Sequence, residues 1–272
     1  MNERQLAAFA QAHGGSIPFD VSPRYLAGPG DARHVTHALA AAGWKPRPDA
    51  DPLSPGVVLT SPDPHTRLQL DPLTADCCWR LEGQTPDHPH WYALSSERIP
   101  EELIAGLTDA LVTGPMREQP AVWDVLSTAD WRSTQHTPLV RRAASPDGLV
   151  EVTRRTFEED QTPYWHIAVR ERSGPSRLVW NLHLSGNTPA HLLTGLATAL
   201  TNPEPVQREM ANGSHYNATS KRSSLTPQQV INAHKARLEK IRAQARTARR
   251  QRPSAQPAPV PAARPTPGAR SR

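Results

Sequence analysis

The sequence contains only two cysteines in 272 residues, and they are neighbours, Cys77 and Cys78. A small secreted scaffold spreads an even number of cysteines along its chain, so this pattern excludes a disulfide framework. Successive residues of a strand point to opposite faces, which predicts one buried thiol and one partly exposed thiol. We expect no redox or metal role for the pair, because no CxxC motif or Cys/His cluster accompanies it.

Long hydrophobic runs are absent as well. No stretch approaches the roughly 20 apolar residues that a membrane-spanning helix needs. The first residues lack a basic segment followed by an apolar run, and the Ala-rich stretch at 6–12 is short and interrupted by glutamine, so we expect no signal peptide. These absences predict a cytoplasmic protein without a membrane span.

Motifs that mark catalytic, metal-binding or nucleotide-binding sites are missing. The sequence has no Gly-x-Ser-x-Gly elbow and no His-Glu-x-x-His pair, and its histidines, among them His88 and His90, follow no metal-binding spacing. Residues 28–33 precede a predicted helix as a dinucleotide loop would, but the third glycine is absent and Pro29 removes an N–H donor. We therefore predict no catalytic residue, no metal site and no cofactor.

Two acidic runs resemble the carboxylate pairs that act as general acid and base. Glu101 and Glu102 open a predicted helix, where the helix dipole favours acids. The second run, residues 158–160, falls at a predicted hairpin. We interpret both runs as exposed surface features.

What the sequence does contain is an internal repeat. The second half of each copy aligns at a constant offset of 89 residues: Trp91 with Trp180, Pro100 with Pro189, Leu103 with Leu192, Gly106 with Gly195. A Ser-Pro-Asp turn recurs at 61–63 and 145–147. Six of the seven tryptophans fall into three pairs: Trp44 with Trp131, Trp79 with Trp165, Trp91 with Trp180. We expect these tryptophans to pack in the core, because they recur at strand centres.

Each copy is predicted to fold as a helix, four antiparallel strands and a second helix, which makes the chain an α+β protein. Alternation such as Arg67-Leu68-Gln69-Leu70 indicates half-buried strands. The predicted strands are 56–60, 67–70, 78–81 and 91–94 in the first copy, and 138–142, 149–156, 165–170 and 178–184 in the second. Thr188 is expected to cap the last helix of the second copy. The sequence leaves open whether the two copies share one sheet.

These landmarks resemble the SPDY domain, a domain of unknown function that occurs, usually in tandem, in proteins of filamentous actinobacteria. The resemblance rests on the Ser-Pro-Asp turns, Gly43-Trp44 after the first helix, the strand tryptophan before the last helix, and Ile99-Pro100 or Thr188-Pro189 at its start. It covers residues 21–203, although Pro64 and Gly148 stand where the family has tyrosine. The resemblance implies the tandem architecture and a bacterial cytosolic setting, and it transfers no catalytic residue.

Charge is distributed unevenly along the chain. From Lys221 onward the sequence has 13 Lys/Arg and one acid, Glu239, a net charge of +12. Residues 1–220 carry the other 18 basic and 25 acidic residues, a net charge of −7. An acidic body with a basic C-terminal segment predicts that the segment attracts polyanions or folds back weakly onto the body.

Residues 226–251 are predicted to form a basic amphipathic helix with Thr226 as N-cap and Pro227 in the first turn. Its apolar stripe comprises Val230, Ile231, His234, Leu238, Ile241 and Ala245. The candidate nucleic-acid contacts are Lys235, Arg237, Lys240, Arg242, Arg246, Arg249 and Arg250, whose role would be phosphate neutralisation. The stripe has no Trp or Phe, which weakens the case for a membrane surface.

The expected division of the chain follows from these patterns. It is an N-terminal helix and linker at 1–20, a first repeat at 21–115, a second repeat at 116–203, a linker at 204–225, the basic helix at 226–251 and a disordered Pro/Ala/Arg tail at 252–272.

Three functions are compatible with this organisation. The first is a non-enzymatic binding or adaptor protein that contacts DNA or RNA nonspecifically through the basic helix. The second is a protein-binding module, chaperone-like or immunity-like, with a passive tail. The third is an enzyme with a site between the repeats, which would require unmatched polar residues such as His166 and Asn181 to converge in a pocket.

Overall fold

The structure, a computed structural model, describes residues 3–47, 56–74, 77–85, 88–157, 162–171, 177–209 and 214–251. Its helices are α1 (Glu3–His13), η1 (Arg24–Leu26, a 3-10 helix), α2 (Arg33–Ala41), α3 (Glu101–Thr113), α4 (Val122–Thr128), α5 (Ala190–Thr201) and α6 (Pro227–Gln251). Its strands are β1 (Pro18–Ser22), β2 (Lys45–Pro46), β3 (Val57–Thr60), β4 (Thr66–Leu70), β5 (Trp79–Thr85), β6 (His88–Ser95), β7 (Arg132–Thr137), β8 (Val140–Ala144), β9 (Val150–Thr156), β10 (Pro163–Arg170), β11 (Leu178–Ser185), β12 (Val206–Glu209) and β13 (Thr219–Arg222). The fold is therefore α+β. The predicted tail at 252–272 and the acidic run at 158–160 lie outside the described residues.

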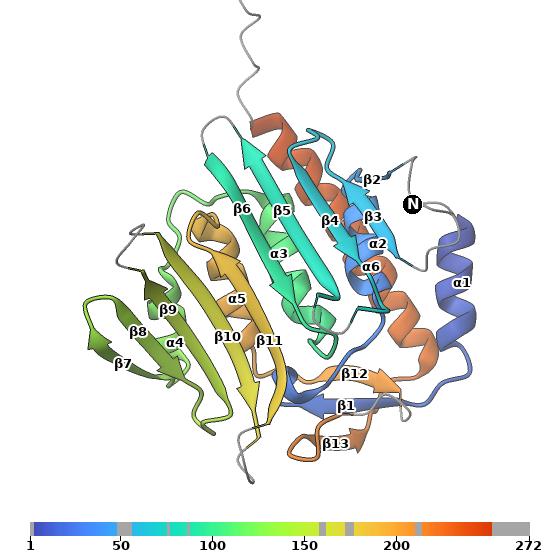
Figure 1. Ribbon diagram of the computed structural model, residues 1–272. Helices are drawn as coiled ribbons and strands as arrows, with labels where there is room; N and C mark the ends of the chain where they lie inside the picture. Colours follow the sequence, from blue (N-terminus) through green and yellow to red (C-terminus); the bar gives the residue numbers. More distant parts are fainter. Residues whose placement is uncertain are drawn as a thin grey trace, which may run out of the picture.

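Ten strands form one antiparallel sheet in the order β2-β3-β4-β5-β6-β11-β10-β9-β8-β7 (Figure 1). The first five strands in this order precede α3, and the last five lie between α4 and α5. The two sets meet where β6 pairs with β11, with Leu94 opposite His183 and Ala93 opposite Leu184. The two halves of the chain thus share a single sheet.

Each half contributes five strands to this sheet, and not the predicted four. The additional strands, β2 and β7, occupy its two edges. β2 contains Pro46, which an edge strand tolerates because one side of its backbone needs no ladder hydrogen bond. β7 is exposed at every position, so it lacks the apolar alternation by which a strand is recognised in sequence.

The core lies between the sheet and a layer of helices on one of its faces (Figure 1). All six paired tryptophans are buried there, each at most 7% exposed, which confirms the prediction that they are core residues. Of the two cysteines, Cys78 is buried and Cys77 is partly exposed, also as predicted.

The recurring Ser-Pro-Asp turns have the same hydrogen bonds in both halves. The hydroxyl of Ser61 donates to Asp63 (2.6 Å) and accepts the N–H of Thr66 (3.0 Å). The hydroxyl of Ser145 likewise donates to Asp147 (2.5 Å) and accepts the N–H of Val150 (3.0 Å). The motif recurs because each serine closes the hairpin between two neighbouring strands.

The two long helices that follow the sheet strands, α3 and α5, cross at a pair of equivalent glycines. A methyl group added at Gly195 would lie 2.5 Å from the carbonyl oxygen of Gly106 and 2.7 Å from the Cβ of Ala110. One added at Gly106 would lie 2.6 Å from the Cβ of Ala199. Only glycine permits this approach of the two backbones, which holds the two halves of the core together.

Parts of the two predicted linkers form strands. β12 and β13, within the predicted linker at 204–225, flank β1 in a separate three-stranded antiparallel sheet. In this sheet Phe19 lies opposite both Arg208 and Arg222. Strand β1 near the N-terminus and the two strands after the second repeat therefore form one sheet. Residues 204–225 are too polar for their sequence to have suggested a strand.

Helix α6 is docked on the body of the protein and does not stand free. Five of the six residues of its predicted apolar stripe are buried: Ile231, His234, Leu238, Ile241 and Ala245. The helix lies against α1, α2 and α3. Its N-cap is as predicted, because the hydroxyl of Thr226 accepts the N–H of Gln229 (3.3 Å). None of the described helices combines the length and apolarity needed to cross a bilayer.

The expected cap at Thr188 is wrong. The residue that precedes α5 is Pro189, and no side chain caps the helix. The hydroxyl of Thr188 donates instead to the carbonyl of Tyr92 (3.4 Å), a residue of the other half. Thr188 thus contributes to the joint between the halves.

The glycine crossing can be tested by Gly195→Ala. Alanine is the better helix former by about 1 kcal/mol, so a loose crossing would be stabilised by this change. Because the added methyl meets backbone at 2.5 Å, we expect the free energy of unfolding, measured with urea, to fall by on the order of 2 kcal/mol. Gly15→Ala is the control, since its added methyl has no neighbour within 4 Å. An unchanged or raised stability of Gly195→Ala would show that the crossing is not tight.

Candidate functional site

Docking divides the seven candidate cations of α6 between its two flanks. With the apolar stripe turned inward, helical spacing places Lys235, Arg246 and Arg250 on one flank, here called the outer flank of α6. All three side chains are exposed. Arg237 and Lys240 lie on the other flank, where they line a groove. The candidate cations therefore lie on two separate surfaces.

Three of the seven cations contact other groups of the protein. Arg237 donates to both carboxylate oxygens of Asp109 in α3 (2.8 and 2.9 Å). Arg242 forms an ion pair with Glu239 one turn earlier. Arg249 donates to the backbone carbonyl of Ala42 at the end of α2. These contacts occupy donors of all three side chains, although Nη1 of Arg237 has no partner in the described part of the chain.

A groove of about 720 Å³ lies between the helices of the two halves. Its floor is the glycine crossing of α3 and α5, with small residues on both helices. Its walls include Arg24 from η1, Gln207 from β12, and Arg237 and Lys240 from α6. The groove is therefore apolar at its base and carries cations from separate segments.

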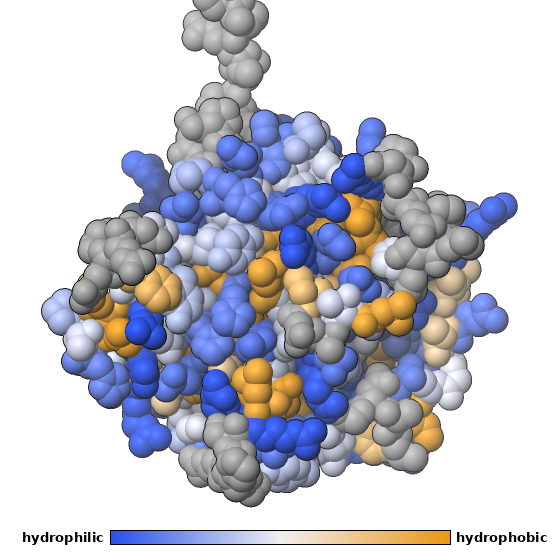
Figure 2. All heavy atoms as spheres, viewed as in Figure 1, coloured by the Kyte–Doolittle hydropathy of each residue, from blue (hydrophilic) through white to orange (hydrophobic). Residues whose placement is uncertain are grey.

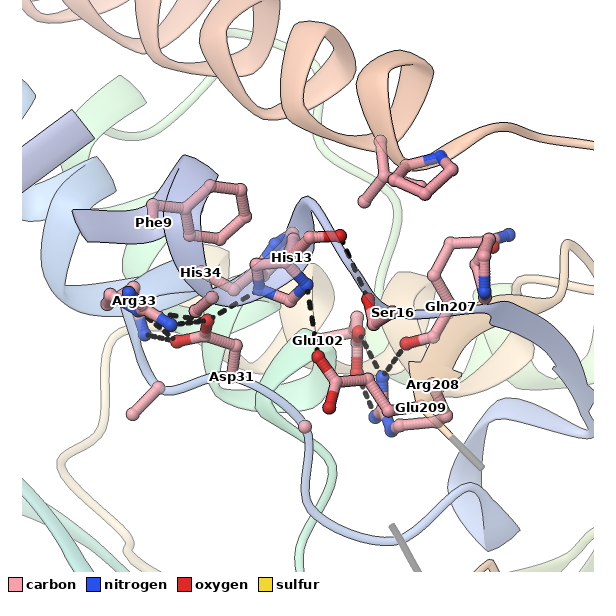
Figure 3. A pocket seen from close by; sticks show the side chains of 16 residues that line it. Phe9, His13, Ser16, Asp31, Arg33, His34, Glu102, Gln207, Arg208 and Glu209 are labelled. Carbon is pink, nitrogen blue, oxygen red and sulfur yellow. Dashed lines mark hydrogen bonds and ion pairs between the residues drawn. The ribbon is translucent and has the colours of Figure 1, made fainter. Parts of the chain in front are cut away.

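Arg208 joins the elements beside this groove (Figure 3). It is 4% exposed and donates to both carboxylate oxygens of Glu102 (2.8 and 2.7 Å) and to the carbonyl of Gly28 (2.9 Å). Burial by itself would raise the pKa of Glu102, but the bonds from Arg208 outweigh it and hold that pKa at about 2. A fully ionised pair thus ties β12 to the start of α3 and to the loop before α2.

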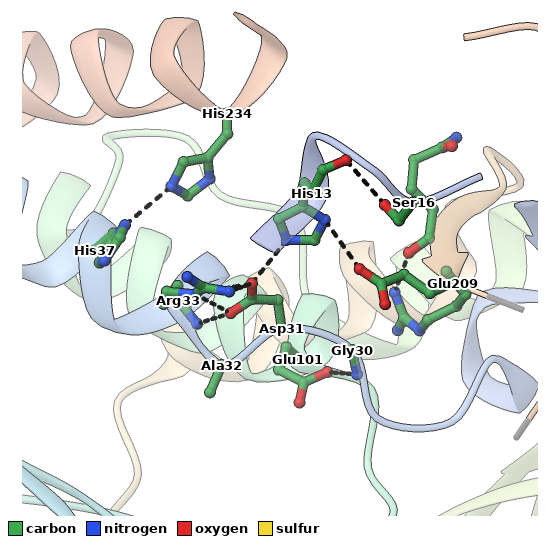
Figure 4. Close-up of polar contacts among 12 residues, drawn as sticks. His13, Ser16, Gly30, Asp31, Ala32, Arg33, His37, Glu101, Glu209 and His234 are labelled. Atoms are coloured by element: carbon green, nitrogen blue, oxygen red, sulfur yellow. Dashed lines mark hydrogen bonds and ion pairs between the residues drawn. The ribbon is translucent and has the colours of Figure 1, made fainter. Parts of the chain in front are cut away.

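Glu101, predicted to lie on the surface, is buried and 4% exposed. Its carboxyl accepts the N–H of Gly30 (Figure 4). Burial, reinforced by the neighbouring carboxylate of Glu102, raises the pKa of Glu101 to about 7. The surface interpretation of Glu101 and Glu102 is wrong, because the partners that draw them inward, Gly30 and Arg208, are distant in sequence. The loop at 28–30 uses its polar backbone groups within the protein.

A second cavity, of about 420 Å³, lies on the other side of His34 and Glu102 (Figure 3). His13 at the end of α1 contacts Asp31 (2.8 Å) and Glu209 (3.4 Å) there. Burial would raise the pKa of Asp31, but bonds from His13 and Arg33 hold it well below its usual range. The polar groups of this cavity are thus largely paired with one another.

Two buried histidines connect α2 to α6. Nδ1 of His37 lies 3.2 Å from Nε2 of His234 (Figure 4), and the ring of His234 stacks on Phe9 of α1 at 3.9 Å. Burial, with further contributions from His37, His34 and Arg237, lowers the pKa of His234 to about 3. Burial also lowers the pKa of His37. Docking of α6 therefore requires neutral imidazoles at this contact.

The polar residues that differ between the two halves do not enter the groove. His166 and His183 stack at 4.4 Å, and Asn181 lies 3.3 Å from His183. They lie on the face of the sheet opposite the helices, a mainly hydrophilic surface (Figure 2), and line none of the described cavities. Over the described ranges, no three His, Cys, Asp or Glu side chains gather as metal ligands.

Comparison with known families finds the SPDY domain, described as a domain of unknown function (DUF317), at residues 60–116 and 144–206. The two segments fall in the two halves of the sheet and include α3 and α5. No curated protein and no solved structure matches the chain.

The histidine contact predicts that acid weakens the docking of α6. In the unfolded chain His234 becomes protonated below its usual pKa of about 6.5, whereas in the folded chain it stays neutral down to about pH 3. The free energy of unfolding therefore falls as the pH drops through this window. We expect a loss on the order of 1 kcal/mol between pH 7.5 and 5 that His234→Leu reduces, measured by urea unfolding. The exposed His65→Gln should keep the full loss. An equal loss in His234→Leu would contradict this assignment.

Glu101 predicts the opposite pH dependence. As the pH rises from 4.5 to 7, the carboxyl of Glu101 ionises in the unfolded chain but stays protonated in the folded chain. The contribution of this group to the free energy of unfolding therefore falls over this range. Glutamine at 101 keeps an acceptor for Gly30 without the charge. We expect Glu101→Gln to be more favourable at pH 8 than at pH 4.5 by on the order of 1–2 kcal/mol, with exposed Glu97→Gln as the control. Equal effects at both pH values would mean that the pKa of Glu101 is the same in the folded and unfolded chains.

Proposed function

Because the chain carries two segments of the SPDY domain, a family without an assigned activity, we propose a function from its surface: the protein is a non-enzymatic binding protein that contacts nucleic-acid phosphates through α6. The bacterial cytoplasm is the proposed setting. The proposal includes the division into tandem repeats at 21–115 and 116–203, each contributing a helix, part of the sheet and a second helix.

The observation that carries the proposal is the orientation of α6. Its apolar stripe is buried in the core, so the stripe is not available to enter a membrane surface. What remains exposed on the outer flank is a row of cations, Lys235, Arg246 and Arg250. The row spans about 22 Å at 1.5 Å of helical rise per residue, which suits contacts with several phosphates. Because phosphate contacts carry no direct sequence information, the binding would be nonspecific.

The open face of the sheet supports the second candidate, a protein-binding module. No helix among the described residues covers this face, which is mainly hydrophilic (Figure 2). Tyr92 in β6 and His183 in β11, the two central strands, are exposed. The two roles are compatible, because the open face and α6 lie on opposite sides of the sheet (Figure 1). An enzyme with a site between the repeats has less support, because the unmatched polar residues lie on the open face and the groove lies among the helices.

The test is fluorescence anisotropy with labelled duplex DNA and single-stranded RNA over a salt series. Removing everything after Ser220 would also remove core residues of α6, so the informative variant is the triple substitution K235Q/R246Q/R250Q. We expect its affinity at low salt to fall at least tenfold. The slope of log K against log salt should decrease by up to about 2.7 for duplex DNA, or about 0.9 for each phosphate that is no longer neutralised.

The matched control lowers the net charge by the same amount on the sheet: R80Q/R132Q/R170Q, all exposed arginines. It should retain most of the affinity. Equal losses in both triple variants would mean that net charge and not α6 governs binding. Failure of the full chain to bind either nucleic acid at low salt would refute the proposal.

A further inference from the structure

The groove between α3 and α5 has the size and lining of a ligand site. Its volume of about 720 Å³ falls within the range of roughly 300–1,000 Å³ that is typical of small-molecule sites. The glycine crossing leaves a floor of small residues: Gly106, Ala110, Gly195 and Ala199. A flat apolar group could lie on this floor without displacing side chains.

The polar end of the groove is lined by the cations Arg24, Arg237 and Lys240 and by the carboxylates Glu102 and Asp109. Three guanidinium groups, Arg24, Arg208 and Arg237, act electrostatically on His34 here, and Glu102 opposes them. That carboxylate already accepts two bonds from Arg208, and Glu204 adds a more distant negative charge near Arg24. Burial, assisted by the charge of Arg237, lowers the pKa of His34 to about 4. The imidazole therefore stays neutral among its cationic neighbours.

Two of these guanidinium groups have buried donors without acceptors. Nε of Arg24 and Nη1 of Arg237 are buried and make no hydrogen bond to any part of the chain that the structure describes. Nη2 of Arg237 is occupied by Asp109, and Nη2 of Arg24 donates to the carbonyl of Glu204 (3.3 Å). A buried donor without a partner costs on the order of 1–3 kcal/mol, so a turn of either side chain that brings this donor to an oxyanion in the groove would be favourable.

The same wall also offers an acceptor. Oε1 of Gln207 is buried and unbonded within the described residues, while its amide nitrogen donates to Asp20 (2.6 Å). A ligand that satisfies all three atoms must carry oxygen acceptors for the two arginines and a hydroxyl or amino donor for Gln207. Lys240, exposed at the rim, adds a further positive charge.

From this arrangement we propose that the groove binds a small organic phosphate of up to nucleotide size. Its phosphate lies between Arg24 and Arg237, a hydroxyl group donates to Gln207, and its uncharged part covers the glycine crossing. A dianionic phosphate is favoured over a single carboxylate, because guanidinium groups match phosphate oxygens in geometry. The two carboxylates that line the groove are already paired, Glu102 with Arg208 and Asp109 with Arg237. This site is separate from the outer flank of α6 and does not depend on nucleic-acid binding there.

The experiment is isothermal titration calorimetry of the full chain at low salt with three probes: AMP, ribose 5-phosphate and adenosine. We expect both phosphates to bind with sub-millimolar dissociation constants and adenosine to bind at least tenfold more weakly than AMP. Arg24→Gln should weaken AMP binding at least tenfold, whereas Arg80→Gln, on the opposite side of the sheet, should leave it unchanged. Absence of binding by both phosphates would refute the proposal.

Two further variants keep the test decisive. Thr198→Trp fills the groove from an exposed position of α5 without removing a buried charge, so it should abolish AMP binding. This variant decides the test if a melting control shows that Arg24→Gln does not fold. The K235Q/R246Q/R250Q protein should bind AMP like the wild type. If that triple variant loses AMP while Thr198→Trp retains it, the phosphate lies on the outer flank, and the groove proposal fails while the function proposed for α6 stands.

Discussion

The close approach of α3 and α5 at Gly106 and Gly195 is the constraint on which the rest of the architecture depends. It brings equivalent helices of the two halves into backbone contact, directly behind the strands β6 and β11 that join the sheet. Because the helices touch at small residues, they leave a groove beside the crossing and do not close over it. The groove is therefore a consequence of this contact, while the pairing of β6 with β11 joins the two halves a second time, in the sheet.

A second set of contacts closes the structure from outside the two halves. Arg208 in β12 holds the first turn of α3 and the loop before α2, and α6 covers α2 and α3 with its apolar stripe. This stripe contributes Leu238, Ile241 and Ala245 to the main core. Helix α6 is thus part of the folded body, and its exposed cations are presented on a docked helix.

The elements that the sequence predicts well are those with periodic apolar residues. The paired tryptophans identified the core of both halves, and Thr226 with the stripe after it located α6. β12 was missed because one of its inward residues is Arg208, which is buried by virtue of a carboxylate 106 positions away. The groove was equally inaccessible to local patterns, because it combines Arg24 from η1 with Arg237 from α6. Long-range charge pairing and close helix contact, and not periodicity, determine these features.

The contact of the first and last helices also bears on the order in which the chain can complete its fold. The apolar surface of α1 and α2 that α6 covers is made early in synthesis, whereas α6 is made after both halves of the sheet. Until residues 227–251 have been synthesised, the apolar surface that α6 buries lacks its cover. The interval before α6 arrives is when this protein is most exposed to misassociation, and it ends with the same helix that presents the cations.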